Sequence, residues 1–177
     1  MKILVASDIH GSAYYMEKLS ERIEAEVPDK IVLLGDLLYH GPRNDLPRDY
    51  APKRVISMLS ELSPAPLCVR GNCEAEVDQM VLPFPVLAEY CVLFYEGRTI
   101  YCTHGHKDVP PLADNDVLLN GHTHVPKCER RERYEYWNCG SVSLPKENTP
   151  HSYMLLDEKE VFWKDVESGE TYNKTRI

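Results

Sequence analysis

Five short apolar runs recur along the chain, and each is interrupted by glycine or by polar residues. They span residues 3–6, 31–34, 67–69, 100–102 and 117–119. Each run is too short for a helix in a packed core and fits a strand that is buried on both faces. The pattern therefore predicts five buried β-strands.

A hairpin and three further strands are predicted in the second half of the chain. Residues 90–95 and 99–103 flank the turn Glu96-Gly97-Arg98, which is typical of a β-hairpin. Turn-forming residues separate three more candidate strands, at residues 134–138, 152–156 and 160–166. We expect these strands to be antiparallel and to complete a second sheet.

Two segments between the first strands carry apolar residues at helical spacing. The first begins near Ser12 and ends before Pro28, with three apolar residues on one face: Met16, Leu19 and Ile23. The second follows Pro52 and ends before Pro64, with four such residues: Val55, Ile56, Leu59 and Leu62. Alternating strands and helices predict an α/β fold. Without a visible repeat or linker, we expect one domain over residues 1–177.

Composition and charge indicate the cellular compartment and limit the classes of partner. The chain has 177 residues, 43% of them hydrophobic, which is enough for one substantial core. Its net charge of −8 argues against a broad basic face for duplex nucleic acid or a track for long DNA. No apolar run approaches the ~20 residues that cross a bilayer, and the opening apolar run is too short for a signal peptide. A cytoplasmic protein is therefore expected.

Six cysteines are scattered along the chain without a paired C-x-x-C motif, which favours free thiols. Cys68 and Cys73 have a spacing similar to that of a zinc knuckle. No second Cys/His pair at a suitable distance completes four ligands, so we do not expect a structural zinc site there.

Each of the five apolar runs is followed closely by residue types that bind metals. These residues are Asp8 and His10, then Asp36, Asn72 and His104, and finally His122 and His124. If the strands share a sheet, their carboxyl ends meet at one edge, where α/β folds place ligand sites. Taken singly, each residue could cap a helix, stabilise a turn or be a hydrogen-bonded histidine. Together they favour a metal centre.

The motifs resemble those of the calcineurin-like metallophosphoesterases, and most closely the small YfcE-type phosphodiesterase subgroup. In chain order they are Asp8-Ile9-His10-Gly11, Gly35-Asp36, His40-Gly41-Pro42-Arg43-Asn44, Arg70-Gly71-Asn72-Cys73-Glu74, His104, Gly121-His122-Thr123-His124 and Gly140-Ser141-Val142-Ser143. The resemblance covers nearly the whole chain. It implies a four-layer α/β/β/α sandwich of two mixed sheets that binds two divalent ions.

The resemblance also implies how the ligands divide between the two ions. One ion would be held by Asp8, His10, Asp36 and His124, and the other by Asp36, Asn72, His104 and His122. Oxygen and nitrogen ligands of this kind suit Mn²⁺, while iron, zinc and nickel are also compatible.

The implied reaction is phosphodiester hydrolysis by a hydroxide that bridges the two ions. Among the ligands, His10, Asp36 and Asn72 are the catalytic candidates. With two carboxylates and a hydroxide, the centre keeps roughly one positive charge, which matches a small phosphodiester with one negative charge. A homo-oligomer is suggested by relatives of this kind, although no interface is visible in the sequence. The alternative function is a weakly active or inactive interaction subunit built on the same fold.

Cys73 is a further catalytic candidate, because it stands where the broad family usually has a proton-donating histidine. A thiol with an ordinary pKa of ~8.5 is a weaker donor near neutrality than an imidazolium of ~6.5. We therefore expect a preference for phenolic leaving groups. Cys73 could equally be a small packing residue.

Three other side chains are secondary candidates. Arg43 and His40 follow Asp36 and could contact the substrate phosphate, although a solvated or ion-paired arginine is more common. His106 follows His104 and is either an alternative ligand or a residue that orients a ligand.

Overall fold

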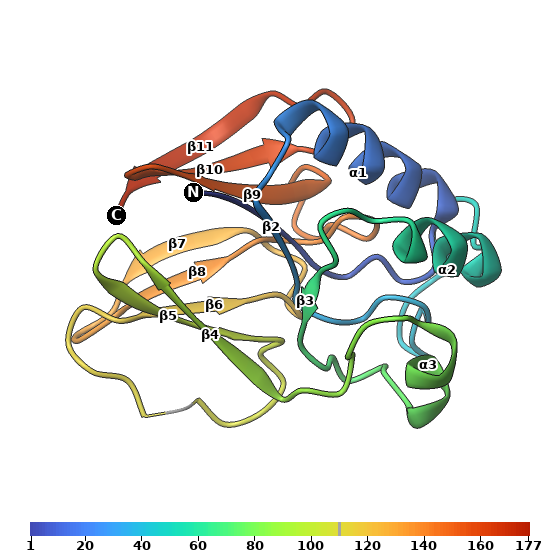
Figure 1. Ribbon diagram of the computed structural model, residues 1–177, viewed down its shortest axis with the longest axis horizontal. Helices are drawn as coiled ribbons and strands as arrows, with labels where there is room; N and C mark the ends of the chain where they lie inside the picture. The colour runs from blue at the N-terminus through green and yellow to red at the C-terminus, as the bar shows by residue number, and fades with distance from the viewer. Residues whose placement is uncertain (110) are drawn as a thin grey trace.

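The computed structural model describes residues 1–109 and 111–177 and contains two mixed β-sheets packed face to face (Figure 1). The six-stranded sheet has the order β11-β10-β9-β1-β2-β3, with these strands at Thr171–Arg176, Glu160–Asp165, Ser152–Asp157, Lys2–Ala6, Lys30–Leu33 and Leu67–Cys68. The five-stranded sheet has the order β4-β5-β6-β8-β7, with these strands at Tyr90–Tyr95, Arg98–Thr103, Val117–Asn120, Glu135–Asn138 and Lys127–Arg130. The predicted α/β class with two mixed sheets is confirmed.

Strand β1 is covered on both faces, which explains its uninterrupted apolar sequence. Ile3 and Val5 point into the core between the two sheets, whereas Leu4 and Ala6 point to the helices. The strand pairs in parallel with β2 and antiparallel with β9. It therefore lies at the centre of the six-stranded sheet, and its carboxyl end is fixed by neighbours on both sides.

Two indole rings fill the core between the sheets. Trp137 and Trp163 are fully buried and meet edge to face, with 6.3 Å between ring centroids and 84° between ring planes. The Trp163 Nε1–H donates to the Asn138 carbonyl oxygen at 2.8 Å, so its one polar group is satisfied. This contact ties β10 of one sheet to β8 of the other.

Both predicted helices are present on the outer face of the six-stranded sheet (Figure 1). Helix α1 spans Ala13–Glu26, and the Ser12 side chain caps it by accepting the Tyr15 backbone N–H at 3.3 Å. Helix α2 spans Pro52–Ser60, with Pro52 in its first turn. Their apolar faces pack on the sheet, as the spacing predicted.

The described residues form one helix and two strands that the hydrophobic pattern did not predict. Helix α3 spans Glu76–Val81 and buries none of its residues, so it has no apolar face to recognise. Strands β7 and β11 are polar and mostly exposed, and they add to sheets whose other strands supply the core.

One sequence-based expectation about the layers needs correction. The segments at residues 152–156 and 160–166 do not complete the second sheet, because β9 pairs with β1 and carries β10 into the first sheet. On the outer face of the five-stranded sheet, Phe94 on β4 is 80% exposed. Hairpin turns and irregular loops join the strands of that sheet in the described part of the chain. None of the described helices has the length and apolar character to span a bilayer.

Candidate metal centre

The predicted ligands follow strands of two different sheets, and the loops of both sheets meet at one end of the sandwich. The five strands do not share one sheet, because the β4–β5 hairpin begins a second sheet that stacks on the first. Two hydrogen bonds join the loops across the gap. The His122 backbone N–H donates to Asp8 Oδ2 at 2.9 Å, and His104 Nδ1 donates to the Leu34 carbonyl at 2.6 Å.

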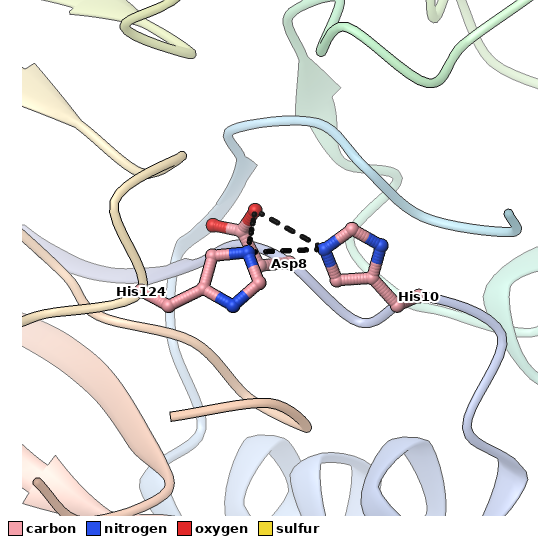
Figure 2. Close-up of side chains that lie close together, drawn as sticks. All are labelled: Asp8, His10 and His124. Carbon is pink, nitrogen blue, oxygen red and sulfur yellow. Dashed lines mark hydrogen bonds and ion pairs between the residues drawn. The ribbon is translucent and has the colours of Figure 1, made fainter. Parts of the chain in front are cut away.

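Three of the predicted ligands converge on one point, as Figure 2 shows for Asp8, His10 and His124. Asp8 Oδ1 lies 3.5 Å from His10 Nε2 and 3.3 Å from His124 Nε2. The two Nε2 atoms are 3.2 Å apart. Ligand atoms about 2 Å from a shared ion are separated by distances of this size. These side chains can therefore hold one cation.

A second group of donors surrounds His104 Nε2. The Asn72 Oδ1 atom lies 3.1 Å from it, His122 Nδ1 lies 3.2 Å from it, and Asp36 Oδ2 lies 3.5 Å from it. The same Asp36 oxygen is 3.7 Å from His10 Nε2 in the first group. Asp36 therefore lies between the two groups, where a ligand shared by two cations would have to be.

Three of the histidines are oriented by backbone carbonyls behind them. His10 donates from Nδ1 to the Tyr39 carbonyl at 2.8 Å, and His124 donates from Nδ1 to the Leu144 carbonyl at 2.6 Å. His104 does the same with Leu34. A carbonyl oxygen can only accept, so Nδ1 carries the proton and each Nε2 is left for a metal.

The backbone at the site is held in an uncommon conformation. Five of the seven predicted ligands have a positive φ between 50° and 66°: Asp8, His10, Asp36, His122 and His124. Left-handed φ values are unusual for residues with a side chain and cluster at functional sites. Gly71 and Gly121 allow this crowding, since a Cβ atom would overlap the Asp36 carboxylate at Gly71 and the Ser7 hydroxyl at Gly121.

The carboxylate of Asp8 fits a divalent cation. Its side chain is fully buried, and among the described residues Oδ1 has no hydrogen-bond partner. Burial alone would raise the pKa of Asp8, but the facing His10 and His124 rings hold it well below its ordinary value. A buried, ionised carboxylate with one oxygen left without a donor is costly unless a cation neutralises it.

His104 binds a proton more tightly than an ordinary histidine does. Burial lowers its pKa, but the hydrogen bond to Asp36 and the charge of Asp8 outweigh burial and raise the pKa to about 9. The pKa of His122 moves the other way, because of burial and the neighbouring charge of His104. Without a metal, the centre therefore binds a proton at His104. The negative charges of Asp8 and Asp36 stabilise that proton.

A cavity of about 360 Å³ opens beside the two groups of donors. Four predicted ligands line it: Asp36, Asn72, His122 and His124. It is also lined by Arg43, Cys73 and Lys146. This cavity offers a place for a substrate beside the candidate metal centre, and Arg43, which was predicted to contact the substrate, is among the residues that line it.

His40 is not among the residues that line this cavity. Its ring packs edge-on against Tyr39 and Tyr50, with centroids 4.7 and 5.2 Å away. His106 also lies outside the two donor groups, with its ring centroid 5.4 Å from that of His104. A position beside a ligand ring is more compatible with support of His104 than with direct ligation.

Cys73 lies at the edge of the site and keeps its proton. Its backbone N–H donates to Asp36 Oδ1 at 2.9 Å, and its Sγ accepts a hydrogen bond from Asn72 Nδ2 at 3.3 Å. Burial raises the pKa of the thiol far above its ordinary value, and the charge of Asp36 adds to the effect. The thiol is therefore a poor proton donor near neutral pH.

Sequence analysis assigned no role to two residues at the centre. Glu74 is 4% exposed, and burial together with the charge of Asp36 raises its pKa to about 7 against the effect of three backbone donors. Its place in the Arg70–Glu74 motif was the only available signal. Lys146 lies on an exposed loop without a motif, so nothing in the sequence marked it.

Known proteins share both this sequence and this fold. Residues 1–161 match the calcineurin-like phosphoesterase superfamily domain. Phosphodiesterase YfcE of Escherichia coli (strain K12) is 45% identical over 161 residues, which cover 89% of this chain and 88% of that protein. The solved structure of Yfce, a phosphoesterase from E. coli, superposes with a TM-score of 0.95 at 41% identity over 100% of both chains.

A more distant structural relative is vacuolar protein sorting 29 from Cryptosporidium parvum. It has a TM-score of 0.65 at 18% identity, over 99% of this chain and 98% of that chain, and at this identity the similarity shows a common fold alone. The match to the superfamily domain confirms the resemblance seen in the motifs, and the chain belongs to the calcineurin-like phosphoesterase superfamily.

Proposed function

We propose that this protein is a two-metal phosphodiesterase that hydrolyses small phosphodiesters. One observation carries the proposal: seven donor side chains from five loops form two groups that share Asp36. Membership of the superfamily makes the chain a phosphoric ester hydrolase. The 45% identity to a phosphodiesterase supports the diester as the substrate class.

Each residue of the centre has a separate role in this proposal. Asp8, His10 and His124 would hold the first ion, and Asn72, His104 and His122 would hold the second. Asp36 would contact both ions. When bound, two such ions activate an attacking water at neutral pH and neutralise charge on the phosphate. The carbonyls behind the three rings accept the Nδ1 protons and so point the Nε2 atoms inward, where they would meet the ions.

The charge of the donor set favours a diester. Asp8 and Asp36 are the only carboxylates proposed as ligands, and Asn72 contributes a neutral oxygen. The two ions therefore keep a positive surplus that attracts an anionic phosphate. Arg43 and Lys146, which also line the cavity, would contact the remaining phosphate oxygens.

The leaving group must depart with little help from Cys73. Its raised pKa leaves the thiol protonated and a weak acid. Among the described residues that line the cavity, the imidazoles are those of His122 and His124, both proposed as ligands. We therefore infer that diesters with a phenolic or other stable leaving group react fastest.

We also propose Mn²⁺ as the metal, with the enzyme working as one domain in the cytoplasm, where it could form a homo-oligomer. Oxygen and imidazole donors without a thiolate ligand suit Mn²⁺, while iron, zinc and nickel are compatible. All six cysteines, which lie in the described part of the chain, are unpaired, as expected in a reducing compartment.

The test is a metal add-back experiment with two aryl esters. The protein is stripped with a chelator, Mn²⁺ is added back, and hydrolysis of bis(p-nitrophenyl) phosphate is compared with that of p-nitrophenyl phosphate. We expect Mn²⁺-dependent turnover that favours the diester. Binding of Mn²⁺ without turnover of either ester would favour the interaction-subunit hypothesis instead, and no binding of divalent ions would refute the metal centre.

A further inference from the structure

Glu74 joins the loop that carries Asp36 to the loop that carries Asn72. Its Oε2 accepts the Asp36 backbone N–H at 2.9 Å and the Gly71 backbone N–H at 2.5 Å. Its Oε1 accepts the Leu37 backbone N–H at 2.7 Å. One buried carboxylate thus satisfies three backbone donors from two loops.

The two loops are packed too closely to tolerate much freedom at this point. A Cβ atom at Gly35 would overlap the backbone of Gly71, and one at Gly71 would overlap Asp36 and Glu74. The Cys73 backbone N–H adds a further link, because it donates to Asp36 Oδ1 at 2.9 Å. Glu74 therefore lies directly behind the Asp36 carboxylate.

Glu74 does not itself face the candidate metal centre. Both of its oxygens are occupied by backbone N–H groups, and it belongs to none of the donor groups found among the described residues. Whatever it does for the centre, it does through Asp36 and the Gly71-Asn72 segment.

We propose that Glu74 is a positioning residue that sets the distance between Asp36 and Asn72, and thereby the affinity of the site for its second cation. Only the part of this inference that concerns metal affinity rests on the proposed function, since the link between the two loops exists in the metal-free protein. Asp36 would contact both ions, so a shift of its loop changes the affinity for both. The affinity for the second ion also depends on Asn72.

A glutamine cannot replace this carboxylate, although it has the same shape. If the amide nitrogen takes the Oε2 position, it meets the N–H groups of Asp36 and Gly71. If it takes the Oε1 position, it meets the N–H of Leu37. In either orientation at least one buried backbone donor loses its acceptor and faces another donor.

The experiment compares Glu74→Gln and Glu74→Asp with a matched control, Asp165→Asn. Asp165 also accepts local donors through a carboxylate, from the Ser168 backbone N–H at 2.7 Å and its hydroxyl at 2.9 Å, but outside the site. Free Mn²⁺ is followed by its paramagnetic resonance signal during titration. Amide hydrogen exchange is measured by NMR on the metal-free proteins.

We expect Glu74→Gln to weaken Mn²⁺ binding roughly 10–100-fold, the usual cost of losing a group that orients ligands. In the metal-free protein, the amides of Asp36, Leu37 and Gly71 should exchange about tenfold faster or more. Glu74→Asp keeps the charge, but its side chain is shorter. Its Mn²⁺ affinity and its amide exchange rates should therefore lie between those of the wild type and those of Glu74→Gln. Asp165→Asn should leave Mn²⁺ affinity and these amides unchanged.

Two results would overturn the inference. One is unchanged exchange at the three amides in both Glu74 variants. The other is a loss of Mn²⁺ affinity in Asp165→Asn equal to that in Glu74→Gln, which would indicate general destabilisation. If the wild type binds no Mn²⁺, the proposed function fails, while the exchange data still decide whether Glu74 links the loops.

Discussion

The Nε2 atoms of His10 and His124 lie 3.2 Å apart, although 114 residues separate the two histidines along the chain. Each ring donates its Nδ1–H to a backbone carbonyl on the far side, so both Nε2 lone pairs point to the same place. Two lone pairs at this distance repel each other unless a proton or a cation lies between them. In this part of the site, protons and divalent cations should therefore compete.

The first prediction concerns His124. Replacing it with alanine removes one donor of the first group, and we expect Mn²⁺ affinity to fall by more than about 100-fold, since even groups behind the ligands are worth roughly 10–100-fold. Activity should fall with it. Isothermal titration with Mn²⁺ measures the change. The control is His151→Ala, because His151 stacks on Tyr15 with ring centroids 3.9 Å apart and lies outside the donor groups. Equal losses in both variants would contradict a specific role for His124.

The second prediction concerns pH. In the metal-free protein the pKa of His104 is raised to about 9 from an ordinary 6.5, so the folded state binds this proton more tightly than the unfolded chain. The stabilisation is fully present below pH 6.5 and is lost as the pH rises through 9. We expect the Tm of chelator-treated protein to fall across this window.

Bound metal should reverse that dependence. A histidine ligand must be neutral, so Mn²⁺ has to displace the proton of His104, and its affinity should rise with pH over the same window. Calorimetric scans with and without Mn²⁺ at several pH values measure both effects. A metal-free Tm that stays level from pH 6.5 to 9 would argue that His104 is not protonated in the apo site.

The candidate ligands could be selected from the sequence because the relevant signals are local. A buried strand such as β1 needs an apolar run, and a ligand directly after the run is placed by the strand itself. The cap at Ser12 is local in the same way, and helix α1 begins where it predicts. These features depend on neighbours within a few residues along the chain.

Other features depend on packing between distant segments, and the sequence could not specify them. Strand β9 carries the same apolar pattern whichever sheet it joins, and its pairing with β1 decides the layer. The left-handed backbone of Asp8 and Asp36 occurs where loops from distant parts of the chain are in close contact. The same holds for the cavity wall, where Lys146 lines the cavity and His40 instead packs against tyrosines.

The third prediction concerns Cys73. A histidine here would put an imidazole at the wall of the cavity, where it could protonate a leaving group, and general acids typically contribute 10²–10⁴-fold. We expect Cys73→His to raise turnover of alkyl phosphate esters by about tenfold or more while aryl diesters change little. Turnover of both ester classes at saturating Mn²⁺ is the measurement. Cys73→Ser is the matched control, and no gain on alkyl esters over this control would favour a packing role for Cys73.

The fourth prediction concerns the neutral ligand Asn72. Its Oδ1 lies 3.1 Å from His104 Nε2, close to the Asp36 carboxylate. Asn72→Asp adds a negative charge where an anionic ester must bind, so we expect KM for bis(p-nitrophenyl) phosphate to rise about tenfold through like-charge repulsion. The comparison must be made at equal Mn²⁺ occupancy. An unchanged KM under that condition would refute the charge argument.

The fifth prediction concerns Lys146, which lines the same cavity as four candidate ligands. Its loop is joined to the centre by the Lys146 backbone N–H, which donates to the His124 carbonyl at 3.2 Å. Because the side chain is exposed, its attraction for a phosphate is screened by salt. We therefore expect Lys146→Ala to raise KM for an anionic diester about three- to tenfold at low ionic strength, with kcat nearly unchanged and the effect shrinking as salt is added.

Lys127→Ala is the matched control, because Lys127 is exposed and lies 3.6 Å from Glu129, away from the cavity. A fall in kcat at constant KM would instead mean that Lys146 acts on the transition state and not on substrate binding.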